Sequence, residues 1–188
     1  MKAYNILGKS LAALALSTAL FGSQAQAFGL GLGYFKCLKQ APINYSKTIA
    51  DLVGENNSFT ILRGLINTAE LGETLASSGP FTVYAPTDAA FGKIPAPLLS
   101  AIGSDIPLLT EVLTYHVSPG ILDPRRAVLP VEIATVEGQT VFFNYGEKGP
   151  QINQSNVSCQ AVRASNGIVW IIDSVLLPQF IGSEPKPE

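Results

Sequence analysis

The sequence predicts an α+β fold in which several short helices cover one side of a mostly antiparallel β-sandwich or wedge. Three observations support this prediction. Apolar residues recur at helical spacing through most of residues 46–115. One strand-like stretch, residues 81–86, interrupts those helices. After residue 116 the chain changes to short β-rich runs separated by turn residues, so helices come first and strands follow.

The helices of the N-terminal half have recognisable starts and stops. Ser46 is expected to cap a short helix that runs to residue 53, and Ser58 a longer amphipathic segment that is broken at residues 78–80. Residues 95–102 and 105–115 each predict a further helix. Pro107 fits the second of these only if it lies in the first turn.

The early strand has the alternation of a sheet with one buried face, because apolar and more polar residues alternate from residue 81 to 85. Pro86 has no N–H to donate to a neighbouring strand, so it should end the strand. Thr87 or Asp88 then offers a side-chain oxygen to cap a short helical turn, which Phe91 packs against the core.

The C-terminal half predicts strands at residues 131–136, 139–145, 151–152, 157–163 and 168–176. Asn166-Gly167 is a strong turn dipeptide immediately before the last strand. Asp173 is expected to accept hydrogen bonds from backbone donors where that strand bends.

The first 27 residues are typical of a secretory signal. Lys2 and Lys9 precede an apolar run at residues 11–21, and Ala-Gln-Ala at 25–27 forms a small-residue cleavage site. The apolar run is shorter than the roughly 20 residues that span a bilayer. We therefore expect a signal peptide at 1–27, an arm at 28–44 that carries Cys37, one domain at 45–178 and a short polar tail at 179–188. This organisation predicts a secreted or periplasmic protein without a transmembrane segment.

Charge and cysteine content narrow the function further. Removing the signal takes away two lysines and no acid, so 12 − 2 = 10 basic residues face 14 acidic ones, a net charge of −4. That balance argues against nucleic acid as a partner. Cys37 and Cys159 are the only cysteines, and an even count in an exported chain favours a disulfide over two free buried thiols. Closing a loop of this size contributes up to about 5 kcal/mol in the chain-entropy model.

Catalytic and metal motifs are missing from the sequence. His116 is the single histidine, which excludes a multi-histidine zinc site, and neither a GxSxG elbow nor a phosphate-binding glycine loop is present. We expect the His116 ring to hydrogen-bond inside the fold at a helix-to-strand junction. Asp88 and Asp173 are conceivable as an acid/base pair, but a capping role and a backbone-acceptor role explain them more simply. The sequence therefore predicts neither an enzyme nor a cofactor.

Two strands are apolar on both faces. Phe143 and Tyr145 share one side of their strand, and Trp170 lies in an apolar run on the last strand. Such strands are either buried under other elements or exposed as a patch for a partner or an apolar ligand. Burial is the default, and Phe143, Tyr145 and Trp170 are the candidate binding residues if the patch is open.

Three segments together resemble the fasciclin (FAS1) domain family: FTVYAPTDAAF at 81–91, the Tyr115-His116 pair, and NGIVWIIDSVLLP at 166–178. The resemblance covers about residues 45–178 and is nearest to the small single-domain secreted bacterial type. It implies an extracellular or periplasmic module for adhesion and binding, in which Thr87, Asp88, Tyr115, His116, Asn166, Gly167 and Asp173 belong to the family's structural motifs. Animal members carry an Asp-Ile pair linked to integrin recognition, whereas this chain has Ala161-Val162 at that place, which puts integrin-type adhesion in doubt.

Two functional hypotheses follow. The first is a non-catalytic binding or adhesion module, monomeric or weakly oligomeric, whose partner is a protein or a polysaccharide at the cell envelope or matrix. The alternative is a carrier of an apolar small molecule such as a carotenoid or a lipid, since the resemblance extends to relatives that bind pigments.

Overall fold

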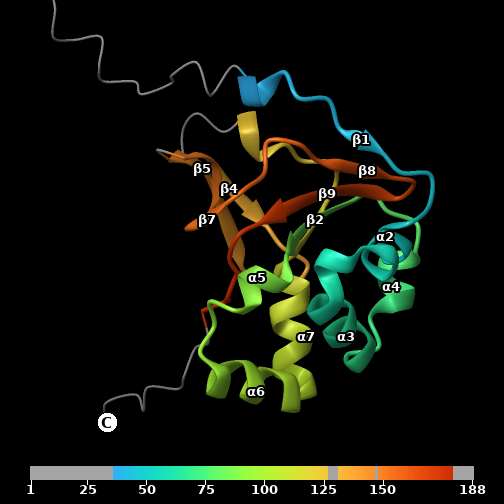
Figure 1. Cartoon of the computed structure of the whole chain (residues 1–188), viewed down its shortest axis with the longest axis vertical. Coiled ribbons are helices and arrows are strands. Elements are labelled where there is room, and N and C mark those ends of the chain that lie inside the picture. Colours follow the sequence, from blue (N-terminus) through green and yellow to red (C-terminus); the bar gives the residue numbers. More distant parts are fainter. Residues whose placement is uncertain (1–35, 127–130, 147, 180–188) are drawn as a thin grey trace, which may run out of the picture.

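The computed structural model describes residues 36–126, 131–146 and 148–179. The expected signal peptide, the first part of the N-terminal arm (28–35) and nearly all of the C-terminal tail lie outside these residues. In the described part, helices pack on one face of a five-stranded sheet and a four-stranded sheet packs on its other face (Figure 1). The result is a three-layer α+β domain, which confirms the predicted fold class.

The helices occupy the first half of the chain, as the apolar periodicity predicts. The helical elements are α2 (Ile49–Glu55), the 3₁₀ turn η1 (Asn57–Phe59), α3 (Thr60–Thr68), α4 (Gly72–Ala76), α5 (Asp88–Phe91), α6 (Ala96–Ser104), α7 (Ile106–Tyr115) and the 3₁₀ turn η2 (Pro124–Arg126). Pro107 lies in the first turn of α7, where its missing N–H costs no intrahelical bond.

The strands form two sheets. The five-stranded sheet has the order β1-β8-β9-β2-β3, with bounds β1 Ile43–Asn44, β2 Phe81–Pro86, β3 Val117–Pro119, β8 Val162–Ala164 and β9 Gly167–Ile172. The four-stranded sheet has the order β4-β5-β6-β7, with bounds β4 Val131–Ala134, β5 Thr140–Gly146, β6 Gly149–Ile152 and β7 Ser155–Asn156. Most neighbours are antiparallel, but β2 runs parallel to β9 and β1 runs parallel to β8.

The central pair β2 and β9 is buried on both faces, which corrects the expectation of one buried face for β2. Val83 and Val169 point toward the helices, whereas Tyr84, Ile168 and Trp170 point toward the four-stranded sheet. Because both layers bury these strands, period-2 alternation of polarity is weak in them. The Tyr84 side chain tolerates burial because its hydroxyl donates to Ser118 Oγ at 3.0 Å.

Two helix starts differ from the sequence prediction. Thr48, not Ser46, caps α2: its hydroxyl accepts from the Asp51 N–H, while the Asp51 carboxylate accepts from the Thr48 N–H. This reciprocal pair is a capping box. Ser58 does not cap α3, because it lies within η1, where its own N–H donates to Asn56 Oδ1.

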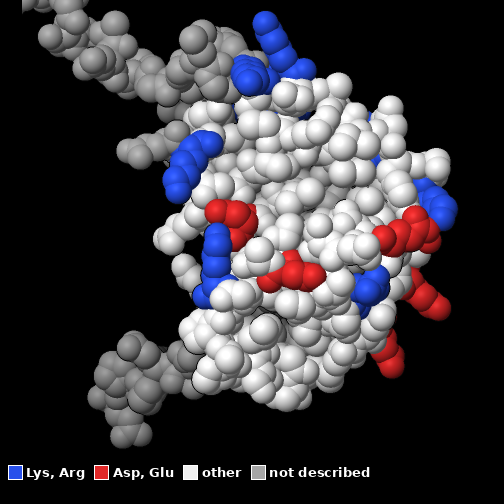
Figure 2. Space-filling model, in the orientation of Figure 1, with Lys and Arg blue, Asp and Glu red and all other residues white. Residues whose placement is uncertain are grey.

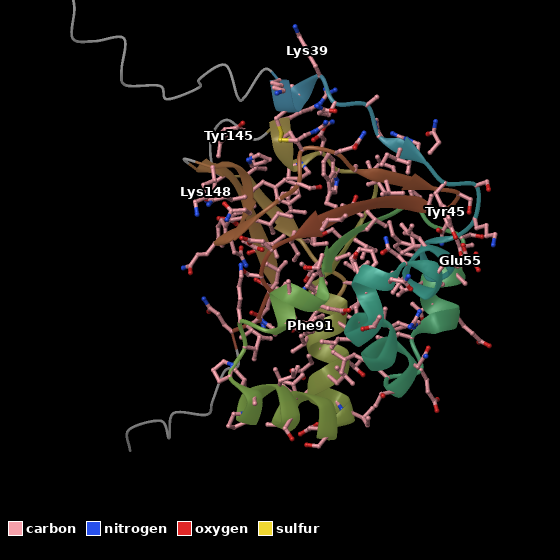
Figure 3. The ribbon with its side chains drawn as sticks, in the orientation of Figure 1. Lys39, Tyr45, Glu55, Phe91, Tyr145 and Lys148 are labelled. Atoms are coloured by element: carbon pink, nitrogen blue, oxygen red, sulfur yellow. A yellow bond between two sulfur atoms is a disulfide. The ribbon has the colours of Figure 1, made fainter. Side chains whose placement is uncertain are left out.

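The interior and the rim of the helical half differ in side-chain chemistry (Figure 3). Phe91 is buried between α5 and the rest of the helical core. At the rim, the Tyr45 hydroxyl donates to the Glu55 carboxylate at 2.6 Å, which joins the segment before α2 to the end of that helix. Lys47 pairs with the same carboxylate.

Candidate functional site

Asp88 is the first residue of α5, but its side chain bonds to the start of α3. The prediction that Thr87 or Asp88 caps α5 through a side chain is wrong, because neither side chain makes that bond and only the Thr87 carbonyl accepts from the α5 N–H groups. The Asp88 carboxylate instead accepts from the N–H groups of Thr60 and Ile61 and from the Thr60 hydroxyl. These bonds, the Thr60 hydroxyl foremost, lower the pKa of Asp88. A carboxylate suits this place because unpaired N–H groups and the helix dipole favour negative charge there.

His116 is buried with both ring nitrogens engaged, as the sequence predicts. Nδ1 lies 2.7 Å from the Val112 carbonyl, and Nε2 accepts from the Leu176 N–H at 2.9 Å. Because Nε2 is an acceptor, the proton of the neutral ring must be on Nδ1. Burial lowers the pKa of His116 to about 4 despite the opposing bond to Val112, so the ring is neutral at pH 7. The ring therefore links α7 to the last segment of the domain.

Asn166 occupies the turn between β8 and β9 and fastens two helices to it. Its Oδ1 accepts from the Ile49 N–H at 2.9 Å, and its Nδ2 donates to the carbonyls of Leu75 and Ser77, each at 2.8 Å. The next residue has to be glycine because its backbone lies against β2. A Cβ added to Gly167 would lie 2.2 Å from the Phe81 carbonyl oxygen. The turn dipeptide predicted from sequence is thus a structural junction.

Asp173 receives backbone and side-chain donors where β9 ends, as expected. Its carboxylate accepts from the Asn156 N–H at 2.9 Å and from Asn156 Nδ2 at 3.0 Å, and it pairs with Lys93 at 3.2 Å. Partial burial raises the pKa of Asp173, but the bonds from Asn156 and Lys93 outweigh it and lower the pKa to about 2. Asp88 and Asp173 thus accept hydrogen bonds from different parts of the backbone, and no donor is shared between them.

Tyr115 points toward the four-stranded sheet, whereas its neighbour His116 bonds to the segment after β9. Its hydroxyl donates to the Thr140 carbonyl at 3.0 Å and accepts from Asn153 Nδ2 at 3.1 Å. The Asn153 carboxamide oxygen in turn accepts from the Phe142 N–H at 2.9 Å. The Tyr115-His116 pair therefore joins α7 both to β5 and to the last segment of the domain.

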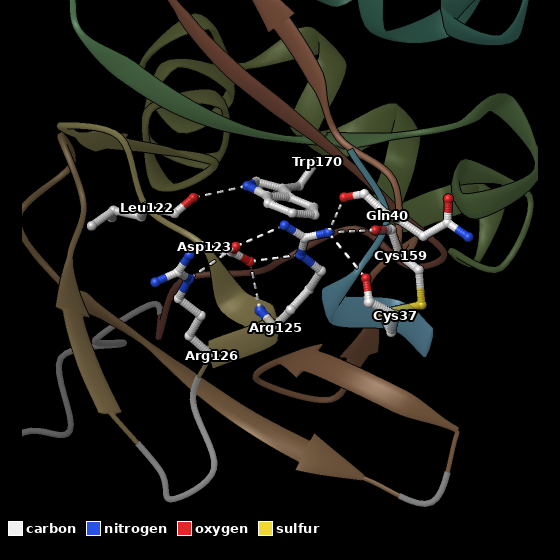
Figure 4. Close-up of polar contacts among 8 residues, drawn as sticks. All are labelled: Cys37, Gln40, Leu122, Asp123, Arg125, Arg126, Cys159 and Trp170. Carbon is white, nitrogen blue, oxygen red and sulfur yellow. Dashed lines mark hydrogen bonds and ion pairs between the residues drawn. A yellow bond between two sulfur atoms is a disulfide. The ribbon is translucent and has the colours of Figure 1, made fainter. Parts of the chain in front are cut away.

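Arg125 forms a buried polar centre that sequence reasoning missed (Figure 4). Its Nη1 donates to the carbonyls of Cys37, Gln40 and Cys159, at 3.1, 2.7 and 3.0 Å. Its Nε and Nη2 make a two-point contact with Asp123, each at 2.8 Å. The predicted disulfide between Cys37 and Cys159 is present, with the two Cα atoms 4.8 Å apart. Arg125 and the disulfide together tie the N-terminal segment to the sheet region.

The Trp170 side chain packs against the Arg125 guanidinium. Of the two alternatives for the strands that are apolar on both faces, burial is therefore the correct one. Trp170 is 0 % exposed, its Nε1 donates to the Leu122 carbonyl at 2.9 Å, and the Arg125 guanidinium lies 4.8 Å from its ring centroid. Phe143 is 3 % exposed and makes an edge-to-face contact with Tyr84. The alternative of an exposed binding patch at Trp170 and Phe143 is therefore wrong. Tyr145, near the end of β5, is partly exposed (Figure 3).

The interior holds little free space. An apolar cavity of about 60 Å³ lies between α3, α4 and the β2–β3 pair, lined by residues that include Leu62, Leu75 and Val117. An engineered cavity that accepts benzene measures about 150 Å³. No group of three or more potential metal-binding side chains occurs in the described part of the chain.

A far larger groove of about 1050 Å³ opens on the outside, between β5, the β6–β7 turn and the segment 174–179. None of the described residues that line this groove carries a charge. They are Tyr115, Gly138, Gln139, Thr140, Phe142, Asn153, Gln154, Ser155, Ser174, Val175, Leu176, Leu177 and Gln179. Sequence reasoning missed this site because its walls come from four separate parts of the chain: Tyr115 and the segments 138–142, 153–155 and 174–179.

The end of the molecule formed by α6 and the start of α7 has a different surface. In the view of Figure 2, no charged side chain covers α6. Leu98 is 36 % exposed and Ile106 45 % exposed on this apolar end. Within the described residues, no individual helix has the length and apolar character of a membrane span, and α6 with α7 meets that test only as a pair bent by 106°.

The fold and these junctions define a class of protein: the chain belongs to the fasciclin domain family. The family model named Fasciclin domain matches residues 57–178. A solved structure of a FAS1 domain pair from the insect cell adhesion molecule Fasciclin I shares the fold, with a TM-score of 0.56 and 16 % identity over 70 % of this chain and 51 % of that chain.

Particular relatives come from two bacterial groups. The chain is 34 % identical to protein sll1483 of Synechocystis sp. over 143 residues, which is 75 % of this chain and 79 % of that protein. It is 37 % identical to the immunogenic protein MPB70 of Mycobacterium bovis, over 62 % of this chain and 60 % of MPB70. The cell surface glycolipoprotein MPB83 of the same species is 35 % identical over 62 % of this chain and 52 % of MPB83.

Proposed function

We propose that this protein is a secreted or periplasmic, non-catalytic binding module that attaches to components of the cell surface or matrix. The open groove beside β5 carries this proposal, because it is a large concave surface on the described domain and its walls are fixed by hydrogen bonds. The name of MPB83, a cell surface glycolipoprotein, and the adhesion molecule that shares the fold support the same assignment.

The motif residues support a role without catalysis. His116 is neutral at pH 7 and gives both nitrogens to the main chain, so it has no free lone pair with which to take a proton from a substrate. Asp88 and Asp173 each accept several hydrogen bonds from other parts of the fold. These groups stabilise the architecture and leave recognition to the exterior.

The proposal is tested by retention on cell envelopes. Purified mature protein, without its first 27 residues, is mixed with washed envelope fractions and whole cells, and the bound fraction is measured against a control protein of similar size and charge. We expect saturable retention that Phe142→Ala weakens, because this exposed ring lies in the groove. Retention no greater than that of the control protein would overturn the proposal.

A second candidate is a carrier of an apolar small molecule. The apolar end at α6 and α7 favours it, since Leu98 and Ile106 are exposed there. The internal cavity of about 60 Å³ is too small for a carotenoid or a lipid chain, so such a ligand would have to bind on the surface. Protein made in its native host would then carry extractable pigment or lipid, and Leu98→Glu would remove it. Material free of both would exclude this candidate.

A further inference from the structure

We propose that the groove beside β5 binds an uncharged polysaccharide chain. This inference rests on the proposed binding function and names the partner class for that site. The groove of about 1050 Å³ runs along the outer face of β5 and is open to solvent, so a chain can lie in it without needing to be threaded through.

The chemistry of the lining matches a neutral sugar. Phe142 is 42 % exposed and Leu177 37 % exposed in the groove, and the Phe142 ring offers an apolar platform on which the C–H face of a sugar ring can pack. Around this platform stand hydroxyl and carboxamide groups, which donate and accept hydrogen bonds as sugar hydroxyls require. Binding sites commonly combine an apolar floor with a few polar groups that fix orientation.

The polar groups divide into those that build the walls and those that are free. Asn153 has a left-handed backbone, with φ 53°, and is locked by bonds to Phe142 and Tyr115. Gln139 bridges to Gln179 in both directions, with its Nε2 donating to the Gln179 carbonyl and its Oε1 accepting from the Gln179 N–H. The groove is therefore shaped before any ligand arrives, which reduces the entropy lost on binding.

Two exposed polar side chains in the groove have no hydrogen bond to any other residue that the structure describes. They are the Thr140 hydroxyl and the Gln154 carboxamide. Thr140 and Phe142 point to the same outer face of β5, and Gln154 lies in the adjacent β6–β7 turn. An apolar ring flanked by free donors and acceptors is the arrangement that a sugar ring with its hydroxyls would fill.

Acidic polysaccharides and lipids fit this lining less well. Among the described lining residues there is no lysine or arginine, and Lys93, which donates to Ser174 at 3.4 Å, is paired with Asp173. The Glu137 carboxylate at the edge of the groove, which accepts from Gln139, would repel an anionic chain. A lipid or a carotenoid would cover the free amide and hydroxyl groups without pairing them, which costs free energy. A neutral chain rich in hydroxyl groups avoids both penalties.

Affinity electrophoresis of the mature protein tests the inference. Gels are cast with neutral polysaccharides (dextran, laminarin and galactomannan) or with acidic ones (alginate and polygalacturonate). We expect at least one neutral polymer to retard the protein and neither acidic polymer to do so. Phe142→Ala should weaken the interaction roughly fivefold through loss of the ring contact. Gln154→Ala should weaken it as well, and its exposed position makes misfolding no explanation.

Ile43→Ala is the matched control, because Ile43 is 53 % exposed on β1, in the other sheet, and does not line the groove. It should bind as the unchanged protein does. Retardation by no neutral polymer, equal retardation of Phe142→Ala, or stronger retardation by the acidic polymers would each overturn the inference. Envelope retention that persists without binding to neutral polymers would leave the proposed function standing and the inference refuted. Binding to a neutral polymer without envelope retention would support the sugar specificity of the groove and refute the proposed attachment to the cell surface.

Discussion

The buried junctions and the outer groove use polar side chains in opposite ways. At the junctions, Arg125, His116 and Asn166 each bond to main-chain groups that are far away in sequence. In the groove, the Thr140 hydroxyl and the Gln154 carboxamide make no hydrogen bond to another described residue. Polar residues in family motifs thus need not mark a binding site, and here they hold layers of the fold together. Variants that separate stability from binding can break or sharpen this contrast.

The largest expected effect is the loss of Arg125. Arg125→Ala removes the guanidinium that joins three carbonyls to Asp123, and it leaves these carbonyls without their donor. The partly buried Asp123 carboxylate loses its two-point contact and keeps only the backbone N–H of residue 125 and the Arg126 side chain at 3.5 Å. Removing one member of a buried pair costs about 3–5 kcal/mol of unfolding free energy. Urea denaturation of the oxidised protein measures this cost. Arg126→Ala is the control, because the Arg126 side chain is 82 % exposed and should change stability by about 0.5 kcal/mol or less. Equal effects of the two variants would contradict the role given to Arg125.

The next effect is a pH dependence from His116. Its pKa is about 4 in the folded protein, against 6.5 as the ordinary value. The unfolded chain therefore takes up a proton before the folded one does, so stability is complete above pH 6.5 and falls as the pH drops toward 4. The pKa difference corresponds to about 3 kcal/mol at most. Urea midpoints across this range should follow that direction, in protein without a histidine tag because His116 is the only histidine.

His116→Gln supplies the control for this pH window. Glutamine does not titrate, so the variant should be less stable at pH 7 but should lack the decline between pH 6.5 and 4.5. The carboxylates with lowered pKa, such as Asp173 at about 2, lose their contribution only at more acidic pH. A decline of the same size in both proteins would show that His116 does not cause it.

A smaller effect is expected at Asn166. Asn166→Asp keeps the acceptor for the Ile49 N–H but places an oxygen against the carbonyls of Leu75 and Ser77, which then lose their donor. Unpaired or repelling polar groups of this kind cost about 2 kcal/mol. Thermal unfolding measures the loss. The neighbouring Ser165→Ala, at an exposed position of the same turn, should be close to neutral. A neutral Asn166→Asp would remove this junction from the account.

Local patterns in the sequence predict much of the fold. Helical spacing and Pro107 place α6 and α7 within one or two residues of their observed starts. The strand ending at Pro86, the turn at Asn166-Gly167 and the disulfide are also as predicted. The short strands β1 and β3 are not predicted, because strands of two or three residues exist only through pairing with distant partners. The strand predicted at 157–163 is wrong in most of its length, because β8 covers only Val162–Ala164 and Val157 makes a single bridge to Ile172.

The sites were harder to predict, since their partners are far apart in sequence. Asp88 caps a helix that begins 28 residues earlier, so its local context suggests the wrong helix. Arginine is usually found on the surface, so the sequence gives no sign that Arg125 is buried. Its three carbonyl partners, which explain the burial, are visible only in the structure. A tryptophan suits both a buried core and an exposed binding patch, so the sequence alone does not show which of the two Trp170 belongs to.

The central claim is that buried polar junctions provide stability while the groove provides recognition. The most direct measurement compares Phe142→Ala with Asn166→Asp for both unfolding free energy and envelope binding, under conditions in which both proteins are folded. We predict that Phe142→Ala loses binding while its unfolding free energy stays within about 0.5 kcal/mol of the unchanged protein, and that Asn166→Asp loses stability but binds normally. Normal binding by Phe142→Ala together with lost binding by folded Asn166→Asp would contradict the claim.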